Sequence, residues 1–178
     1  MQSNKIFIKR LKEKTIYKKF FQPLKPDQYH YSDADDFFKY YWKEFEAYKT
    51  KEKIVNNQVP GDVFEIIIGF ILDYENLEIY SMDENIKGVT YVKPDFILKN
   101  ERKNIFISCK TSIRERWKQA DWESMRYKKI FPDAKCFVIT NHEKEAITLK
   151  GKLNDIDIDM VFYSGSSEIN DFVKKLKL

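Results

Sequence analysis

The sequence predicts an α/β (α+β) fold in which a mixed central β-sheet is flanked by helices. The chain has 178 residues, of which 43% are hydrophobic, enough to build the core of one domain. Only 5 glycines and 5 prolines are present, which argues against disorder and low-complexity architectures. Segments with helical spacing of apolar residues alternate with short apolar runs, and this succession of elements is typical of a sheet covered by helices.

Two helices are predicted in the first half of the chain. Residues 33–54 open with acidic residues and close with lysines, as the helix dipole favours. Residues 60–74 begin with Pro60, which suits a first helical turn, and are almost wholly apolar, so this helix should be buried. Glu65 is the exception within it. A buried carboxylate needs a partner, a metal ion or a water-filled cleft, and the alternative is a solvated edge of the helix.

The second half of the chain carries most of the predicted strands. Residues 89–98 and 104–111 are expected to form a hairpin around the polar turn 99–102, with a further candidate strand at 77–80. Ser112 and Glu115 have the spacing of a capping box, which predicts a helix from Ser112 to about Ile130. Strands at 134–140 and 159–163 and a helix at 166–178 complete the predicted elements.

The net charge of +4 is unevenly distributed along the chain. Residues 1–30 and 100–135 are basic, whereas residues 31–99 are acidic. The pattern suggests a polyanion-binding surface, and the alternative is the solvated face of a lysine-rich protein. The longest apolar run, Ile66–Leu72, is too short to span a membrane. The N-terminus lacks the apolar region of a secretory signal, and we expect reduced cysteines and a cytoplasmic protein.

Four residues suggest a chemical site. Asp95 lies on the first strand of the hairpin, and Ser108 and Lys110 share one face of the second because side chains alternate along a strand. Glu123 lies on the following helix, which can turn back over the end of that strand. Two carboxylates, Asp95 and Glu123, can hold Mg²⁺, and a neighbouring lysine can orient or deprotonate a water molecule. These residues therefore suit phosphodiester hydrolysis.

The residues Pro94–Asp95 and Ser108–Cys109–Lys110 resemble the PD-(D/E)xK nuclease motif, with Ser108 at the position of its second acid. In the branch of type II restriction endonucleases related to EcoRII and NgoMIV, the following helix supplies that acid, and Glu123 matches this position. The same branch carries an R-(D/E)-R element that reads CC:GG base pairs, here Arg114, Glu115 and Arg116. The upstream Glu65 is similar to a further acidic residue of the family. The resemblance spans about residues 60–140.

The resemblance implies a restriction-endonuclease-like core and a Mg²⁺-dependent, sequence-specific endonuclease acting on double-stranded DNA. Asp95 and Glu123 would bind the metal, Lys110 would act on the water, and Glu65 would support the site. A single nuclease domain over 1–178 is expected, with a basic helical N-terminal arm at 1–55 and a catalytic core at 56–178. The arm could wrap DNA or another subunit, or be merely solvated. We expect a homodimer, a cognate DNA methyltransferase as genetic partner and no membrane.

Three alternatives stay open at this point. The same core could serve a structure- or damage-specific nuclease, such as a junction resolvase, a nicking enzyme or an RNA nuclease. The chain could instead be a non-catalytic DNA-binding module in which Ser108 marks a lost metal site. A purely structural or protein-interaction role would leave the spacing of Asp95, Lys110 and Glu123 without a cause.

Overall fold

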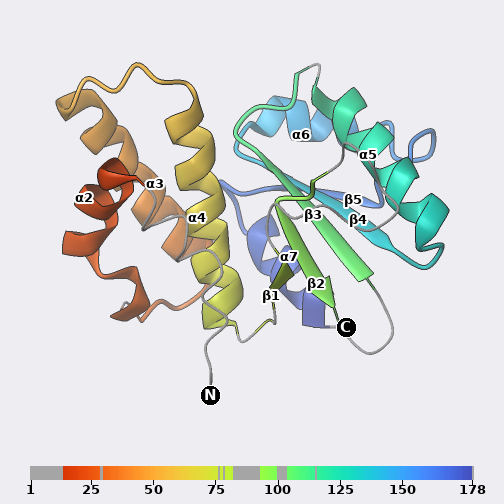
Figure 1. The fold of residues 1–178 in the computed structure, drawn as a ribbon, viewed down its shortest axis with the longest axis horizontal. Coiled ribbons are helices and arrows are strands. Elements are labelled where there is room, and N and C mark those ends of the chain that lie inside the picture. The colour runs from red at the N-terminus through yellow and green to blue at the C-terminus, as the bar shows by residue number, and fades with distance from the viewer. Residues whose placement is uncertain are drawn as a thin grey trace.

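The computed structural model describes residues 14–28, 30–75, 77, 79–81, 93–99, 104–114 and 116–177. A five-stranded sheet forms the centre, and helices cover both of its faces (Figure 1). The strands are β1 (Ile79–Ser81), β2 (Phe96–Lys99), β3 (Asn104–Lys110), β4 (Lys135–Thr140) and β5 (Met160–Tyr163). The helices are α2 (Thr15–Leu24), the short 3₁₀ helix η1 (Pro26–Gln28), α3 (Ala34–Lys51), α4 (Gln58–Tyr74), α5 (Arg116–Ile130), α6 (Glu143–Lys150) and α7 (Glu168–Lys177).

The sheet is mixed, which confirms the predicted fold class. Its strands follow sequence order, with β1, β2 and β3 antiparallel and β3, β4 and β5 parallel. The predicted hairpin is therefore β2–β3, in which Phe96 pairs with Ile107. The crossover from β3 to β4 carries α5, and that from β4 to β5 carries α6. Because β3 and β4 are parallel, the loops that leave their carboxyl ends lie at the same edge of the sheet.

The first face of the sheet carries the larger core, built by α3, α4 and α7 with inward residues of β2 to β5. Helix α4 is buried along most of its length, as its composition predicts; Phe64, Ile66 and Ile67 have no exposed surface. It begins two residues earlier than expected, so Pro60 falls within its first turn. The N–H groups of the first turn have no partner in the helix, so the missing N–H of proline costs no hydrogen bond there.

Helix α2 lies within the N-terminal arm that was predicted to be helical; its bounds were not predicted, and it belongs to the same core. Tyr17, Phe20 and Phe21 are buried there, with Phe20 edge-on to Phe45 of α3 at 5.6 Å between ring centroids. The Tyr17 hydroxyl also donates to Asp62 of α4. Residues 15–24 are thus packed against the domain. The helix is strongly amphipathic: its lysines lie on the solvent side, and its aromatic residues lie in the core.

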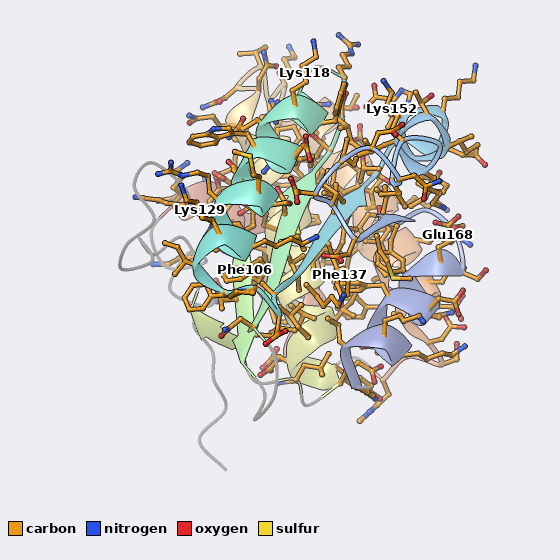
Figure 2. The ribbon with its side chains drawn as sticks, turned by 90° about the vertical axis from the view of Figure 1, so that its right-hand side faces the viewer. Phe106, Lys118, Lys129, Phe137, Lys152 and Glu168 are labelled. Carbon is orange, nitrogen blue, oxygen red and sulfur yellow. The ribbon has the colours of Figure 1, made fainter. Side chains whose placement is uncertain are left out.

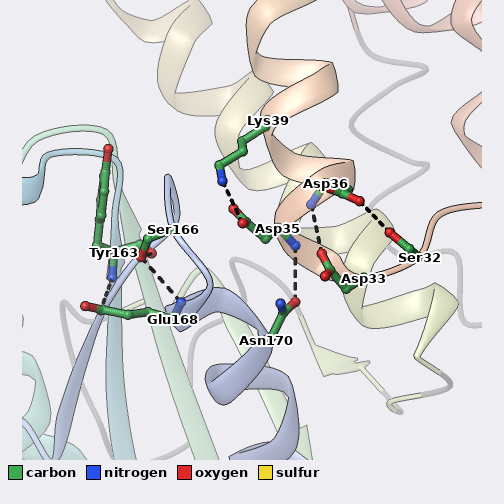
Figure 3. A network of polar contacts seen from close by, with 9 residues as sticks. All are labelled: Ser32, Asp33, Asp35, Asp36, Lys39, Tyr163, Ser166, Glu168 and Asn170. Atoms are coloured by element: carbon green, nitrogen blue, oxygen red, sulfur yellow. Dashed lines mark hydrogen bonds and ion pairs between the residues drawn. The ribbon is translucent and has the colours of Figure 1, made fainter.

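Polar side chains form hydrogen bonds where α3 and α7 pack together (Figure 3). Asp33 caps α3 by accepting from the backbone N–H of Asp36 at 3.0 Å, as its acidic start predicts. The N–H of Asp35 donates to the Asn170 side chain of α7 at 3.2 Å. Glu168, in the first turn of α7, accepts from the N–H of Tyr163 at 2.9 Å and so joins this helix to the end of β5.

The second face carries α5 and α6 over two smaller apolar clusters. Figure 2 shows α5 lying across β3 and β4, with Lys118 near its start and Lys129 near its end. Asp121 of α5 accepts from the N–H of Asp157 at 2.6 Å, and Lys128 pairs with Asp159 at 3.1 Å. These contacts fix α5 against the segment that leads into β5.

Within the part of the chain that the structure describes, no helix is both long enough and apolar enough to cross a lipid bilayer.

We predict that Ile66→Ala lowers the free energy of unfolding by about 2–5 kcal/mol, because it leaves a cavity in the larger core. Ile147→Ala is the matched control, since Ile147 also lies in a helix but has 63% of its surface exposed. The gain in helix propensity is the same for both variants. Urea unfolding would measure the two changes, and similar losses for both would contradict the assignment of the core.

Candidate active site

Asp95, Ser108 and Lys110 lie on one face of the β2–β3 hairpin. Asp95 directly precedes β2. It lies two residues before Ile97, so both side chains are on the same face of the sheet, and Ile97 packs beneath α5. Ser108 and Lys110 lie on the same face of β3 as Phe106. The ring of Phe106 stacks on Tyr127 of α5 with 4.1 Å between ring centroids. All three polar residues therefore project toward the α5 side of the sheet.

One oxygen of Asp95 collects the hydrogen bonds of this group. Oδ2 accepts from the backbone N–H of Cys109 at 2.6 Å and from the Lys110 ammonium at 3.0 Å, with the Ser108 hydroxyl at 3.5 Å. Asp95 and Lys110 form an ion pair whose side chains are only 11% and 15% exposed. Burial alone would lower the pKa of Lys110, but the carboxylates of Asp95 and Glu123 raise it above its usual value, which keeps the ammonium charged.

Glu123 brings the second carboxylate to the group from α5. It is 7% exposed, and its Oε1 accepts from the side chain of Gln119, one turn earlier, at 2.7 Å. Burial raises the pKa of Glu123; Gln119 and Lys110 oppose this rise, and Asp95 adds to it. Glu123 also lines a small pocket together with Pro94 and Ser108. The two acids and the lysine thus form one electrostatic unit.

The chemistry of these donors fits a hard divalent cation. Among the described residues, every hydrogen bond of Asp95 falls on Oδ2, and the one of Glu123 falls on Oε1. With respect to these described residues, each carboxylate therefore has one oxygen that could be offered to a cation, and Mg²⁺ prefers such ligands. No set of three or more histidine, cysteine or acidic side chains that could hold a metal occurs within the described ranges. A cation here would complete its shell with water and substrate oxygens.

Glu65 is buried on α4, with 9% of its surface exposed, as the prediction of a buried carboxylate requires, and the alternative of a solvated helix edge is wrong. Helix α4 packs on the first face of the sheet, whereas Asp95, Lys110 and Glu123 face α5. The structure brings the latter three together and places Glu65 on the helix behind the sheet. A supporting role for Glu65 stays a prediction.

Arg114 lies in the loop that joins β3 to α5, Arg116 is the first residue of α5, and Glu115 between them lies outside the described residues. The side chain of Arg114 is 85% exposed, and Arg116 is also exposed at the first position of α5. The predicted start of this helix at Ser112 is wrong. Ser112 donates to Glu145 of α6, so its hydroxyl serves a tertiary contact and the helix begins four residues later.

Two polar residues at the site were missed by the sequence analysis. Gln119 lies four residues before Glu123, a spacing at which helical side chains meet, and this signal was available. Glu145 lies in a helix that was not predicted at all, and it contacts residues 112–114 across more than thirty positions of sequence. Its acidic neighbour Glu143 just after His142 was the available indication of a helix start.

We predict that the Asp95–Lys110 pair contributes a coupling energy of about 0.5–3 kcal/mol to folding. The reason is that removing either partner leaves a buried charge without compensation. A double-mutant cycle with Asp95→Asn and Lys110→Met, measured by urea unfolding with a chelator present, would give this value.

The control is the Asp171–Lys174 pair on α7, whose side chains are 65% and 75% exposed. The cycle with Asp171→Asn and Lys174→Met should give about 0.5 kcal/mol or less, because solvent screens such a pair. Equal coupling in the two cycles would show that the Asp95–Lys110 pair is not a buried interaction in solution.

Comparison with known proteins gives one informative match. No family model matches the chain, and no curated protein is similar to it. Among solved structures, the complex of restriction endonuclease PspGI with substrate DNA superposes with a TM-score of 0.65. The match covers 97% of this chain and 80% of that chain, at 20% sequence identity. At this identity the likeness concerns the fold, and it shows that the chain has a restriction-endonuclease-like fold.

Proposed function

We propose that this chain is a Mg²⁺-dependent endonuclease that cleaves double-stranded DNA at a specific sequence, as a type II restriction enzyme. The observation that carries the proposal is the convergence of Asp95, Lys110 and Glu123 on one face of the sheet. The structural likeness to a restriction endonuclease bound to substrate DNA supports the same conclusion. The sequence also resembles the PD-(D/E)xK motif in the form whose second acid comes from the following helix. Glu123, on α5, stands at that position.

Asp95 and Glu123 are the proposed Mg²⁺ ligands, each through the oxygen that is not engaged in the hydrogen bonds described above. When bound, the ion supplies the Lewis acidity that polarises the scissile phosphate. The protein itself fixes the two carboxylates: the Cys109 N–H holds Asp95, and Gln119 holds Glu123. Such fixed ligands lower the reorganisation that the reaction requires.

Lys110 is proposed to act directly at the reacting phosphate. Its ammonium has three hydrogens, of which one bonds to Asp95 at 3.0 Å. The others can orient the attacking water and neutralise negative charge that develops on the phosphate oxygens. Because Asp95 anchors Lys110, the position of this positive charge is coupled to the carboxylate that would bind the metal.

Arg114, Glu115 and Arg116 are proposed to read CC and GG steps in the major groove. A guanidinium can bond to O6 and N7 of guanine, and a carboxylate can accept from N4 of cytosine. Both arginines are exposed, and the loop and first helical residue that bear them follow Lys110 closely in the chain. The reading and cleaving residues would therefore share one short connection. A palindromic site would favour a homodimer, and a cognate methyltransferase would protect the host DNA.

We predict that Lys110→Ala reduces the rate of DNA cleavage by about 10²–10⁴-fold, since it removes the positive charge beside the phosphate. Cleavage of plasmid DNA of varied sequence, with Mg²⁺ and then with EDTA, would measure the effect, and EDTA should abolish cleavage by the wild type. Lys175→Ala is the control, because Lys175 is exposed on α7.

Full cleavage by Lys110→Ala, or no cleavage by the wild type of any such plasmid, would overturn the proposal. Preference for branched or nicked DNA would indicate a structure-specific nuclease instead. DNA binding without any uptake of Mg²⁺ or Mn²⁺ in calorimetry would indicate a non-catalytic binding module.

We predict that Arg116→Ala weakens binding to CC/GG-containing sites by about 1–3 kcal/mol and leaves binding to unrelated DNA nearly unchanged. The reason is that a base-reading arginine contributes discrimination, whereas phosphate contacts act on all sequences alike. Fluorescence anisotropy at fixed salt, with thermal unfolding to confirm folding, would measure the change.

The control is Lys129→Ala at the other end of α5 (Figure 2), which should weaken binding to both DNAs equally or not at all. Unchanged affinity of Arg116→Ala for CC/GG sites would remove Arg116 from the base-reading residues.

A further inference from the structure

Glu145 of α6 binds the backbone of the loop that connects β3 to α5. Its carboxylate accepts from the N–H of Arg114 at 3.0 Å and from the N–H of Ile113. The Ser112 hydroxyl lies 3.0 Å from both of its oxygens. One side chain thus contacts three consecutive residues of the loop from a helix that follows the next strand.

The loop adopts a backbone conformation that needs such support. Arg114 has a φ of 30°, in the left-handed region that residues other than glycine rarely adopt, since the Cβ atom crowds the backbone there. The N–H groups that precede α5 also lack partners within the helix. The carboxylate of Glu145 satisfies two such N–H groups, at Ile113 and Arg114, and so stabilises this conformation.

Apolar packing fixes the loop between β3 and α5 at Ile113 but not at Arg114. Ile113 is buried beneath α5 and α6, but the Arg114 side chain points to solvent with 85% exposure. A pocket of about 210 Å³ lies beside it, lined by Arg114, Trp117 and Lys152 among others. The loop therefore has room to change conformation if the carboxylate is removed, although Ile113 stays anchored.

The charge of Glu145 suits this contact. Burial alone would raise the pKa of Glu145, but the N–H groups of Arg114 and Ile113 and the Ser112 hydroxyl lower it below its usual value. The Arg114 guanidinium lies 3.9 Å from the carboxylate and the His142 imidazole 3.7 Å from it, so a permanent positive charge also faces Glu145. Glu145 is accordingly a carboxylate at neutral pH, able to accept all of these bonds.

A role in the dipole of α6 does not explain the contact. Glu145 lies in the first turn of α6, where an acidic residue is favourable, but Glu143 occupies the same turn and is exposed. The bonds of Glu145 run to the loop before α5. The parallel pairing of β3 and β4 brings the two elements to one edge of the sheet, where Asn141 donates to the Lys110 carbonyl at 3.4 Å.

We propose that Glu145 is a positioning residue for sequence recognition: it holds residues 112–114 in the conformation that presents Arg114 and Arg116 to DNA. This inference rests on the proposed function, in which these arginines read bases. Glu145 does not touch DNA in this role. It acts through the backbone, and its removal affects the choice between sequences more than the chemistry at Asp95, Lys110 and Glu123.

The test compares Glu145→Ala and Glu145→Gln with Glu143→Ala as the matched control. The first measurement is amide hydrogen exchange of the loop. Exchange at Ile113 and Arg114 should accelerate at least tenfold in Glu145→Ala, because an unbonded amide opens more readily. It should accelerate less in Glu145→Gln, which retains one acceptor oxygen, and stay unchanged in Glu143→Ala. This measurement needs no nuclease activity, so it tests the contact even if the wild type does not cleave DNA.

The second measurement is the ratio of cleavage rates on the best-cleaved site of the wild type and on the same site with one base pair changed. Glu145→Ala should lower this ratio by about tenfold or more, the scale of one base contact, while thermal unfolding shows a folded protein. Glu145→Gln should restore part of the ratio. Accelerated exchange with an unchanged ratio in either variant would overturn the role in recognition, and unchanged exchange would overturn the contact itself. Absence of cleavage by the wild type would contradict the proposed function and with it the recognition role of Glu145, whereas the exchange measurement would still decide whether Glu145 holds the loop.

Discussion

The alternation of side chains along β3 determines how the rest of this structure is arranged. Ile105, Ile107 and Cys109 face the larger core, so Phe106, Ser108 and Lys110 must face α5. The antiparallel pairing with β2 brings Asp95 to the same face, and the parallel pairing with β4 requires a crossover helix that covers it. One strand thus supports the apolar core with one face and the candidate site with the other.

The candidate site consists of charged side chains, and burying these charges costs free energy. Asp95 and Lys110 compensate one another, whereas burial and the Asp95 carboxylate both raise the pKa of Glu123. Two carboxylates in one buried group are unfavourable for folding, and a divalent cation would relieve their repulsion. The charged group of the candidate site therefore opposes folding, and the large core around α4 provides compensating stability.

Much of the fold was predictable because local signals and tertiary requirements agreed. The apolar run of α4, the acidic start of α3 and the hairpin at β2–β3 each follow from residues adjacent in sequence. The spacing of Asp95, Lys110 and Glu123 likewise predicted a common face, since strand alternation and the next helix constrain it. The burial of α2 was not predicted, because a basic composition is typical of a solvated arm, and only the contact with α3 and α4 shows that Tyr17 and the phenylalanines lie in the core.

The sequence by itself determined the apolar segments, the position of the β2–β3 hairpin, and the expectation that two acids and a lysine lie on one face of the sheet. Only the tertiary structure decided that Ser112 bonds to Glu145 rather than capping α5, and that Glu65 is buried on a helix behind the sheet. The physical reason is that a hydroxyl or carboxylate has several partners of similar strength, local and distant. Which partner it meets depends on how strands far apart in sequence pair, and no local pattern contains that information.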